Sequence, residues 1–261
     1  MPRAIPSRLS PFLAPIAHRG LHDAATGRIE NSASAFHAAV AAGVGIECDV
    51  QAAAGDEPIV FHDETLDRLI GRPDAVADLS AAQLSQIAYP GTRDRIIPLA
   101  DLFAEINAAV PLMVEIKTVS GRDWRPLADR VIGLASAYRG PVALKSFDTD
   151  LVAHIKTAAP TLPRGLVAAD LRNEVQLADD RARVDRMAHL LDSGPADPMF
   201  VSYRASDLPN PVVRYVRDVV GLPVFTWTIR DLESVAAAKR WADAPIFEAL
   251  APDDVKAAWT S

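Results

Sequence analysis

Residues 45–50 run Gly-Ile-Glu-Cys-Asp-Val, a short apolar strand pattern that carries two carboxylates. Side chains alternate between the two faces of a strand, so Glu47 and Asp49 share one face and the apolar side chains share the other. The apolar face suits burial beneath helices, but two carboxylates cannot stay ionised in apolar surroundings without a compensating cation. The fold must therefore give this strand helices on one side and a polar, cation-containing site on the other.

A second strand, Met-Val-Glu-Ile-Lys, repeats this design and places Glu115 and Lys117 on one face. Three carboxylates from two strands, Glu47, Asp49 and Glu115, predict a site for one divalent cation, Mg²⁺ or Ca²⁺, because such ions take oxygen ligands. The alternative is that Arg19 and Lys117 pair with these carboxylates. We expect too few nearby cations to pair all three, so Glu47→Gln should raise stability slightly by relieving repulsion in the metal-free protein.

Residues 58–62, Pro-Ile-Val-Phe-His, form another apolar run close behind the first strand. Only seven residues, 51–57, separate the two runs, and a Gly-Asp pair among them supplies a turn. A parallel crossover needs about a dozen residues or more, so the two runs should form an antiparallel hairpin. This hairpin would bring His62 across from the neighbourhood of Glu47.

Strand and helix patterns alternate along the rest of the chain. We predict parallel strands at residues 14–18, 46–50, 111–117, 141–146, 164–168, 198–203, 223–229 and 245–248, and helices at 31–42, 98–109, 123–139, 149–159, 172–193, 211–219 and 231–241. Eight strands alternating with helices indicate an α/β fold, a distorted TIM (β/α)8 barrel, as one domain over residues 1–261. Residues 63–97 should form a small insertion after the second strand that caps the barrel mouth. A doubly wound sheet is the alternative fold, but it would not place functional residues at the ends of so many strands.

Bulk composition excludes several classes of protein. The net charge of −7 argues against nucleic-acid binding. A single cysteine, Cys48, excludes an internal disulfide and suits a reducing, cytoplasmic compartment. The first 15 residues contain four prolines and do not resemble a signal peptide. No segment approaches the roughly 18 apolar residues of a transmembrane helix.

Several short motifs follow one another in a fixed order. They are His18-Arg19-Gly20, Glu30-Asn31-Ser32, Gly45 to Val50, Val60 to Arg68 and Glu115 to Lys117, with weaker marks at Ser146-Phe147 and Trp227-Thr228-Ile229. No single motif is specific, but the ordered set resembles the glycerophosphodiester phosphodiesterase family from residue 14 to about residue 230. The resemblance implies a distorted TIM barrel that hydrolyses glycerophosphodiesters, which are small molecules, to glycerol 3-phosphate and an alcohol.

The resemblance also implies roles for individual residues. It implies that His18 and His62 are the general acid/base pair, and we favour His62 as the acid because the hairpin places it beside the carboxylates. It implies that the divalent ion is held by Glu47, Asp49 and Glu115.

Four further residues are expected to contact the substrate, the first two of them because the resemblance implies it. Arg19 and Lys117 would hold the phosphate charge, Arg19 as a planar fork and Lys117 as a point charge. Trp227 and Phe147, near the ends of their strands, are expected to lie against the substrate, and packing in the core is the alternative for both.

The chain departs from the family pattern at the substrate end of the pocket. Arg230 stands where the family has Asn, and residues 242–248 replace the family's final Gly-x-Asp-x-Ile-x-Thr-Asp strand. We therefore expect an altered or relaxed preference among alcohol headgroups. Of two further polar residues, Asp63 is expected to cap the turn that follows it, and Lys145 to face the side opposite Ser146.

Two other functions are compatible with the sequence. A lysophospholipase D acting on lipid phosphodiesters would be favoured if the insertion at residues 63–97 lined an apolar mouth. A non-catalytic protein that binds phosphodiester headgroups is the alternative outside the enzymes.

Overall fold

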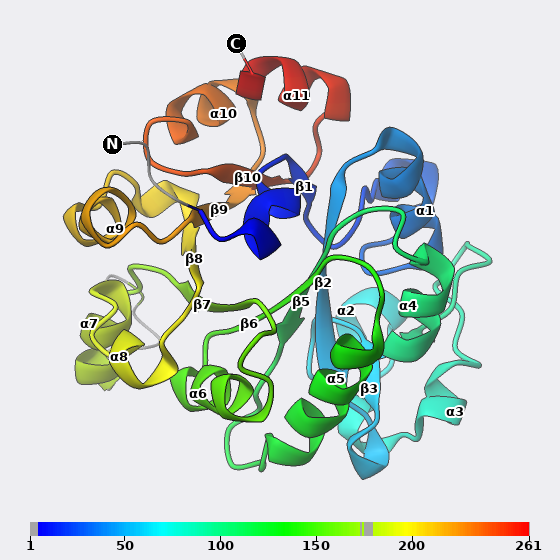
Figure 1. The fold of residues 1–261 in the computed structure, drawn as a ribbon. Helices are drawn as coiled ribbons and strands as arrows, with labels where there is room; N and C mark the ends of the chain where they lie inside the picture. The colour runs from blue at the N-terminus through cyan, green and yellow to red at the C-terminus, as the bar shows by residue number, and fades with distance from the viewer. Residues whose placement is uncertain (1–4, 173, 175–179, 261) are drawn as a thin grey trace.

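Eight parallel strands close into a barrel in the computed structural model, which describes residues 5–172, 174 and 180–260 (Figure 1). In spatial order they are β1 (Ile16–Ala17), β10 (Ala244–Phe247), β9 (Val224–Ile229), β8 (Phe200–Arg204), β7 (Arg164–Ala168), β6 (Val142–Ser146), β5 (Leu112–Ile116) and β2 (Gly45–Ala52). Strand β2 pairs with β1 and so closes the ring. The predicted TIM barrel is confirmed, and a doubly wound sheet is excluded because its edges would stay open.

Helices surround the barrel (Figure 1). They are α1 (Ala33–Ala42), α4 (Leu99–Ile106), α5 (Arg125–Ala137), α6 (Thr149–Ala158), α7 (Arg181–Ala188), α8 (Ser193–Ala196), α9 (Pro211–Tyr215), α10 (Leu232–Ala238) and α11 (Pro252–Thr260). The helix predicted for residues 172–193 falls partly on residues 173 and 175–179, which lie outside the described residues. Its described part holds the short helix α7, and the further short helix α8 begins only at Ser193, where the predicted range ends. The terminal helix α11 has no counterpart among the predicted elements.

Local capping explains where several helices begin. The Ser32 hydroxyl accepts a hydrogen bond from the Ala35 N–H at the start of α1, and Gly43 ends this helix with a φ of 62°. The Asp148 carboxylate caps α6, and the Asp231 carboxylate caps α10. The predicted starts of these helices are therefore confirmed.

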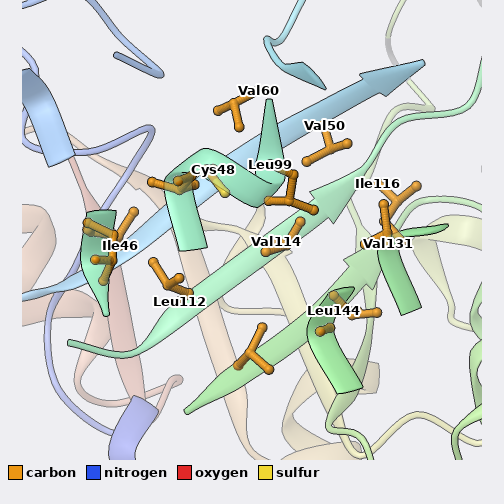
Figure 2. Packing of buried hydrophobic residues seen from close by; sticks show 14 of the residues in the cluster. Ile46, Cys48, Val50, Val60, Leu99, Leu112, Val114, Ile116, Val131 and Leu144 are labelled. Atoms are coloured by element: carbon orange, nitrogen blue, oxygen red, sulfur yellow. The ribbon is translucent and has the colours of Figure 1, made fainter. Parts of the chain in front are cut away.

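The outer faces of β2, β5 and β6 form the main hydrophobic core with the helices that cover them. Ile46, Cys48 and Val50 point outward from β2, and Val114 and Leu144 do so from the next two strands. Figure 2 shows these side chains packed against Leu99 of α4 and Val131 of α5. The apolar alternation in the sequence therefore marks the outer face, and Cys48 is a packing residue as expected.

The predicted hairpin is present. Strand β3 (Pro58–Val60) runs antiparallel to β2 with Val50 opposite Val60, and β4 (Ile97–Pro98) pairs antiparallel to β3. The insertion between them contains α2 (Asp67–Ile70), α3 (Ala81–Leu84) and the short turn η4 (Val76–Asp78). Its apolar side chains pack on those of the hairpin in a cluster of their own, which includes Phe61 and Tyr89. That the insertion caps the barrel mouth stays a prediction.

The N-terminal segment fills one end of the barrel interior. Leu9 and Phe12 of the short helix η1 (Ser7–Phe12) are buried against inward side chains such as Met113 and Phe225. In Figure 1 this helix, drawn in blue, lies over the centre of the ring. The apolar plug leaves the polar site to the other end, where the strands terminate. None of the helices in the described part of the chain has the length and apolar character needed to cross a membrane.

Candidate active site

Three carboxylates meet inside the barrel at the ends of two adjacent strands. Glu47 and Asp49 project from β2, and Glu115, which is the register partner of Asp49, projects from β5. All three are buried, with 1–5% of their surface exposed, and one oxygen from each lies within 4.8 Å of the others. The predicted acidic cluster is therefore present on the inward face.

Three cations accompany these carboxylates. Lys117 Nζ lies 2.9 Å from Asp49 Oδ1 and also contacts Glu115, and Arg19 Nε lies 3.2 Å from Asp49 Oδ2. The third cation is Lys145, which contacts Glu47 and Glu115. The expectation that too few cations surround the cluster is therefore wrong.

Lys145 faces the acidic cluster. Its Nζ lies 2.9 Å from Glu47 Oε1 and 3.0 Å from Glu115 Oε2, and only 2% of the residue is exposed. Parallel register pairs Glu115 with Lys145, and paired residues of adjacent parallel strands point to the same side. Ser146 points the other way and donates a hydrogen bond to the Ile116 carbonyl. Lys145 and Ser146 therefore point to opposite sides of β6, as expected. The side that Lys145 faces is the inward one, which holds the acidic cluster, and this position was not predicted from the sequence.

Two carboxylates of the cluster, Asp49 and Glu115, are held in their charged forms. Burial raises the pKa of the Asp49 carboxyl, but Lys117 and Arg19 outweigh burial and hold this pKa well below its usual range. Burial opposes ionisation of Glu115 too, and the ammonium groups of Lys117 and Lys145 nevertheless lower its pKa. Both His62 and His18 are close enough to Asp49 to lower the pKa of its carboxyl further. Two histidines and the acidic cluster thus share one site.

His18 follows β1 and is anchored from the far end of the chain. Its Nδ1 lies 2.5 Å from Glu248 Oε2, and His22 Nε2 lies 3.4 Å from the same oxygen. The other carboxylate oxygen of Glu248 accepts a hydrogen bond of 2.7 Å from Arg230 Nε. The two positions at which the sequence departs from the family pattern therefore contact each other and support His18.

His62 follows β3 and has the same kind of support. Its Nδ1 lies 2.7 Å from Asp63 Oδ1, and Arg68 Nε donates a hydrogen bond of 2.6 Å to Asp63 Oδ2. The expectation that Asp63 caps a turn is wrong, because α2 has Leu66 at its N-cap and no side chain caps it. Each histidine thus has Nδ1 on a carboxylate that an arginine holds, which leaves its Nε2 for chemistry.

The loop before α1 completes the support of the site. Glu30 accepts hydrogen bonds from Arg19 and Arg68, at 2.6 and 2.7–2.8 Å. The Asn31 amide donates to Asp49 Oδ2 at 3.0 Å, while its oxygen accepts from the Asp49 backbone N–H. The Glu-Asn-Ser motif marked this loop in the sequence, but nothing local showed which groups it would bind.

Two aromatic side chains lie together at the ends of β6 and β9. The rings of Phe147 and Trp227 are 5.7 Å apart and nearly perpendicular. Trp227 Nε1 donates a hydrogen bond to the Ser202 carbonyl, which fixes the orientation of the indole ring. The structure thus brings together the two residues expected to contact the substrate.

The acidic cluster has the chemistry of a divalent-cation site. Carboxylate oxygens are the ligands that Mg²⁺ and Ca²⁺ prefer. Glu47 Oε1 is buried and accepts no hydrogen bond of regular geometry from any described residue, although Lys145 Nζ lies 2.9 Å away. Lys145 thus supplies a cation to this oxygen without metal, while Glu47, Asp49 and Glu115 each bring one oxygen within 4.8 Å of the others. Glu47, Asp49 and Glu115 therefore fit one divalent cation.

A second group could also hold a metal ion. Ligand atoms of His18, His22 and Glu248 lie within 4.8 Å of one another. His18 and Glu248 already face each other at hydrogen-bond distance, and Arg230 occupies the other Glu248 oxygen. The closeness of these three residues is therefore explained by the contacts of Glu248 with His18 and His22, without a metal ion.

Comparison with known proteins finds matches over most of the chain. The sequence matches the family model described as "Glycerophosphoryl diester phosphodiesterase family" over residues 18–253. Among curated proteins, "Probable glycerophosphodiester phosphodiesterase 1" of Mycobacterium tuberculosis is 26% identical over 249 residues, which cover 86% of this chain and 84% of that protein.

Solved structures share the fold. A phosphodiesterase of Oleispira antarctica, solved with the product sn-glycerol-3-phosphate, superposes with a TM-score of 0.75 at 21% identity and covers 95% of this chain and 97% of its own. A glycerophosphodiester phosphodiesterase of Thermotoga maritima gives a TM-score of 0.68 at 24% identity and covers 93% and 95% of the two chains. At these identities the likeness concerns the fold.

Proposed function

The chain belongs to the glycerophosphoryl diester phosphodiesterase family, and from this premise we propose how its site hydrolyses small glycerophosphodiesters. The substrates would include glycerophosphocholine and glycerophosphoethanolamine, and the products would be glycerol 3-phosphate and the free alcohol. One observation carries the proposal: His18 and His62, each with Nδ1 on a carboxylate, flank a cluster of carboxylates and cations.

The two histidines would divide the proton transfers. One takes a proton from water or from the glycerol 2-hydroxyl as that oxygen attacks phosphorus, and the other protonates the departing alkoxide. The side chain of His62 is 31% exposed, compared with 11% for His18. The alcohol has to leave toward solvent, so we assign His62 as the acid and His18 as the base.

Arg19 and Lys117 would bind the phosphate. Both side chains are 17–18% exposed, so each can reach a bound substrate while staying in contact with Asp49. Arg19 offers a planar fork of N–H donors and Lys117 a compact positive charge. Together they would offset the charge of the phosphodiester as it reacts.

Glu47, Asp49 and Glu115 would hold one divalent cation, Mg²⁺ or Ca²⁺. Such an ion supplies Lewis-acid stabilisation of charge on a phosphoryl oxygen. Asn31 keeps Asp49 oriented toward that position through two hydrogen bonds.

Phe147 and Trp227 would line the side of the site that receives the alcohol. The perpendicular rings offer an apolar and π surface to a small headgroup. Arg230 is engaged with Glu248, so an altered headgroup preference would come from the space around this pair. Replacing Arg230 by Asn and comparing kcat/KM across headgroups tests that expectation; an unchanged sharp preference contradicts it.

A single assay tests the proposed function. Release of the free alcohol, choline or ethanolamine, is measured from glycerophosphocholine, glycerophosphoethanolamine and a lysophospholipid with one of these headgroups, with Mg²⁺, with Ca²⁺ and with excess chelator. We expect turnover of the two small substrates with metal, loss of turnover with chelator, and loss in Glu115→Gln. The matched control is Glu57→Gln, which removes an exposed carboxylate that forms an ion pair with Arg130.

The remaining outcomes discriminate between the alternatives. Full activity in excess chelator would reject the metal assignment. Preference for the lysophospholipid would favour the lysophospholipase D alternative. No turnover of any substrate with either metal would favour a non-catalytic binder.

A further inference from the structure

The Lys145 ammonium lies in the acidic cluster and bridges two of its three carboxylates. Its Nζ lies 2.9 Å from Glu47 Oε1 and 3.0 Å from Glu115 Oε2. We propose that Lys145 is a resident cation of the metal site: it holds Glu47 and Glu115 in place without metal and weakens the binding of the divalent ion. The inference rests on the metal site proposed above and adds a residue that opposes the metal.

The position of Lys145 is fixed by the sheet. It is the register partner of Glu115, so the backbone of β6 sets its height in the barrel. Its side chain is 2% exposed, whereas those of Lys117 and Arg19 are 17–18% exposed. Lys117 and Arg19 can therefore turn toward a bound phosphate, but Lys145 has no route to solvent and must remain beside any ion that enters.

Charge balance gives this arrangement a consequence for function. Three carboxylates and one fixed ammonium carry two net negative charges, which a single divalent cation neutralises. The charges of Arg19 and Lys117 are then left over for the anionic substrate. Without Lys145 the cluster would carry three negative charges, which would bind a divalent cation more tightly and would hold Arg19 and Lys117 more strongly at the carboxylates that they contact.

Direct binding measurements test this role independently of activity. The full-length protein is stripped with chelator, and the affinities of Ca²⁺ and Mg²⁺ alone are measured by calorimetry for wild type, Lys145→Met and Lys145→Gln. We expect both variants to bind at least about tenfold more tightly than wild type, because a like charge is removed at close range. Lys156→Met, which removes an exposed lysine paired with Asp197, is the matched control and should leave the affinity unchanged.

Thermal unfolding of the same proteins gives a second readout. Without metal, Lys145→Met should melt below wild type because Glu47 loses its partner, and saturating Ca²⁺ should raise its melting temperature more than it raises that of wild type. If Lys145→Met folds only with Ca²⁺ present, the inference is supported, and Lys145→Gln, which keeps a hydrogen-bonding head, supplies the affinity comparison.

The outcomes separate this inference from the metal site itself. Metal binding to wild type with no gain in either Lys145 variant overturns the role of Lys145 and leaves the metal site standing. No binding to wild type or to any variant overturns both. Binding to the Lys145 variants alone supports the inference in its strongest form, in which the ammonium takes the place of the ion.

Discussion

The Nδ1 atom of His18 lies 2.5 Å from a carboxylate oxygen of Glu248, a residue 230 positions further along the chain. Strands β1 and β10 are neighbours in the barrel, and this pairing brings the two side chains together. Arg230 holds the other oxygen of Glu248, just as Arg68 holds the Asp63 carboxylate that binds His62. Both histidines therefore present Nε2 from a support made of a carboxylate and an arginine.

Replacing Glu248 by Gln should lower kcat with little change in KM. The amide cannot accept a charge-assisted hydrogen bond from His18, so the imidazole loses its orientation and the stabilisation of its cationic form. We expect a loss of roughly 10²-fold, the lower end of what a positioned acid or base contributes. Steady-state kinetics on glycerophosphocholine measures it, and Glu248→Asp should restore part of kcat. Equal losses of kcat in Glu248→Asp and Glu248→Gln would contradict the role of the Glu248 carboxylate in orienting His18.

The two histidines should respond differently to the leaving group. Choline leaves as a strongly basic alkoxide that needs a proton, whereas nitrophenolate can leave unprotonated. We expect His62→Ala to reduce hydrolysis of glycerophosphocholine by roughly 10²–10⁴-fold and to reduce hydrolysis of a nitrophenyl phosphodiester much less. His18→Ala should damage both reactions similarly. If both variants lose the same factor on both substrates, the proposed division of labour is wrong.

Glu47→Gln should lower the free energy of unfolding of the metal-free protein. Glu47 and Lys145 are both buried and paired, so removing the Glu47 charge breaks this pair and leaves the Lys145 ammonium with its contact to Glu115. Breaking a buried pair costs about 3 kcal/mol or more, whereas the exposed pair removed by Glu57→Gln should cost less than about 1 kcal/mol. Chemical denaturation in chelator compares the two variants. Relief of repulsion among the carboxylates, the expectation from sequence alone, would give a rise in stability instead.

Glu248 should make the stability of the protein depend on pH in the acid range. Burial opposes its ionisation, but hydrogen bonds from His18 and His22 lower its pKa well below the ordinary value of 4.5. Because the unfolded state then binds the proton more readily, this contribution is present above about pH 4.5 and is lost as the pH falls through the folded-state pKa. Denaturation between about pH 5.5 and pH 3.5 should therefore show a shallower loss of stability in Glu248→Gln than in wild type. Identical slopes in the two proteins would contradict this, and Glu57→Gln serves as the exposed control.

The sequence by itself determined the local part of the structure. The period of two along residues 45–50 and 113–117 is an adjacent-residue property, and it placed Glu47 with Asp49 on one face of the first strand and Glu115 with Lys117 on one face of the second. The short connection through residues 51–57 allowed only a hairpin, which brought His62 to the site. The regular alternation of strands and helices was enough to predict an eight-stranded barrel.

Only the tertiary structure decided which groups meet across strands. Strand alternation shows from the sequence that Lys145 and Ser146 point to opposite faces. The contact between Lys145 and Glu115 follows from the register of β5 and β6, which no local pattern contains. The partnership of His18 with Glu248 likewise requires the ring to close between the first and last strands. Side-chain direction is set by neighbours in sequence, whereas the choice of partner is set by the packing of the whole barrel. For this reason the sequence predicted the carboxylates, the histidines and the cations Arg19 and Lys117, and only the fold supplied Lys145 and the carboxylates that hold the two histidines.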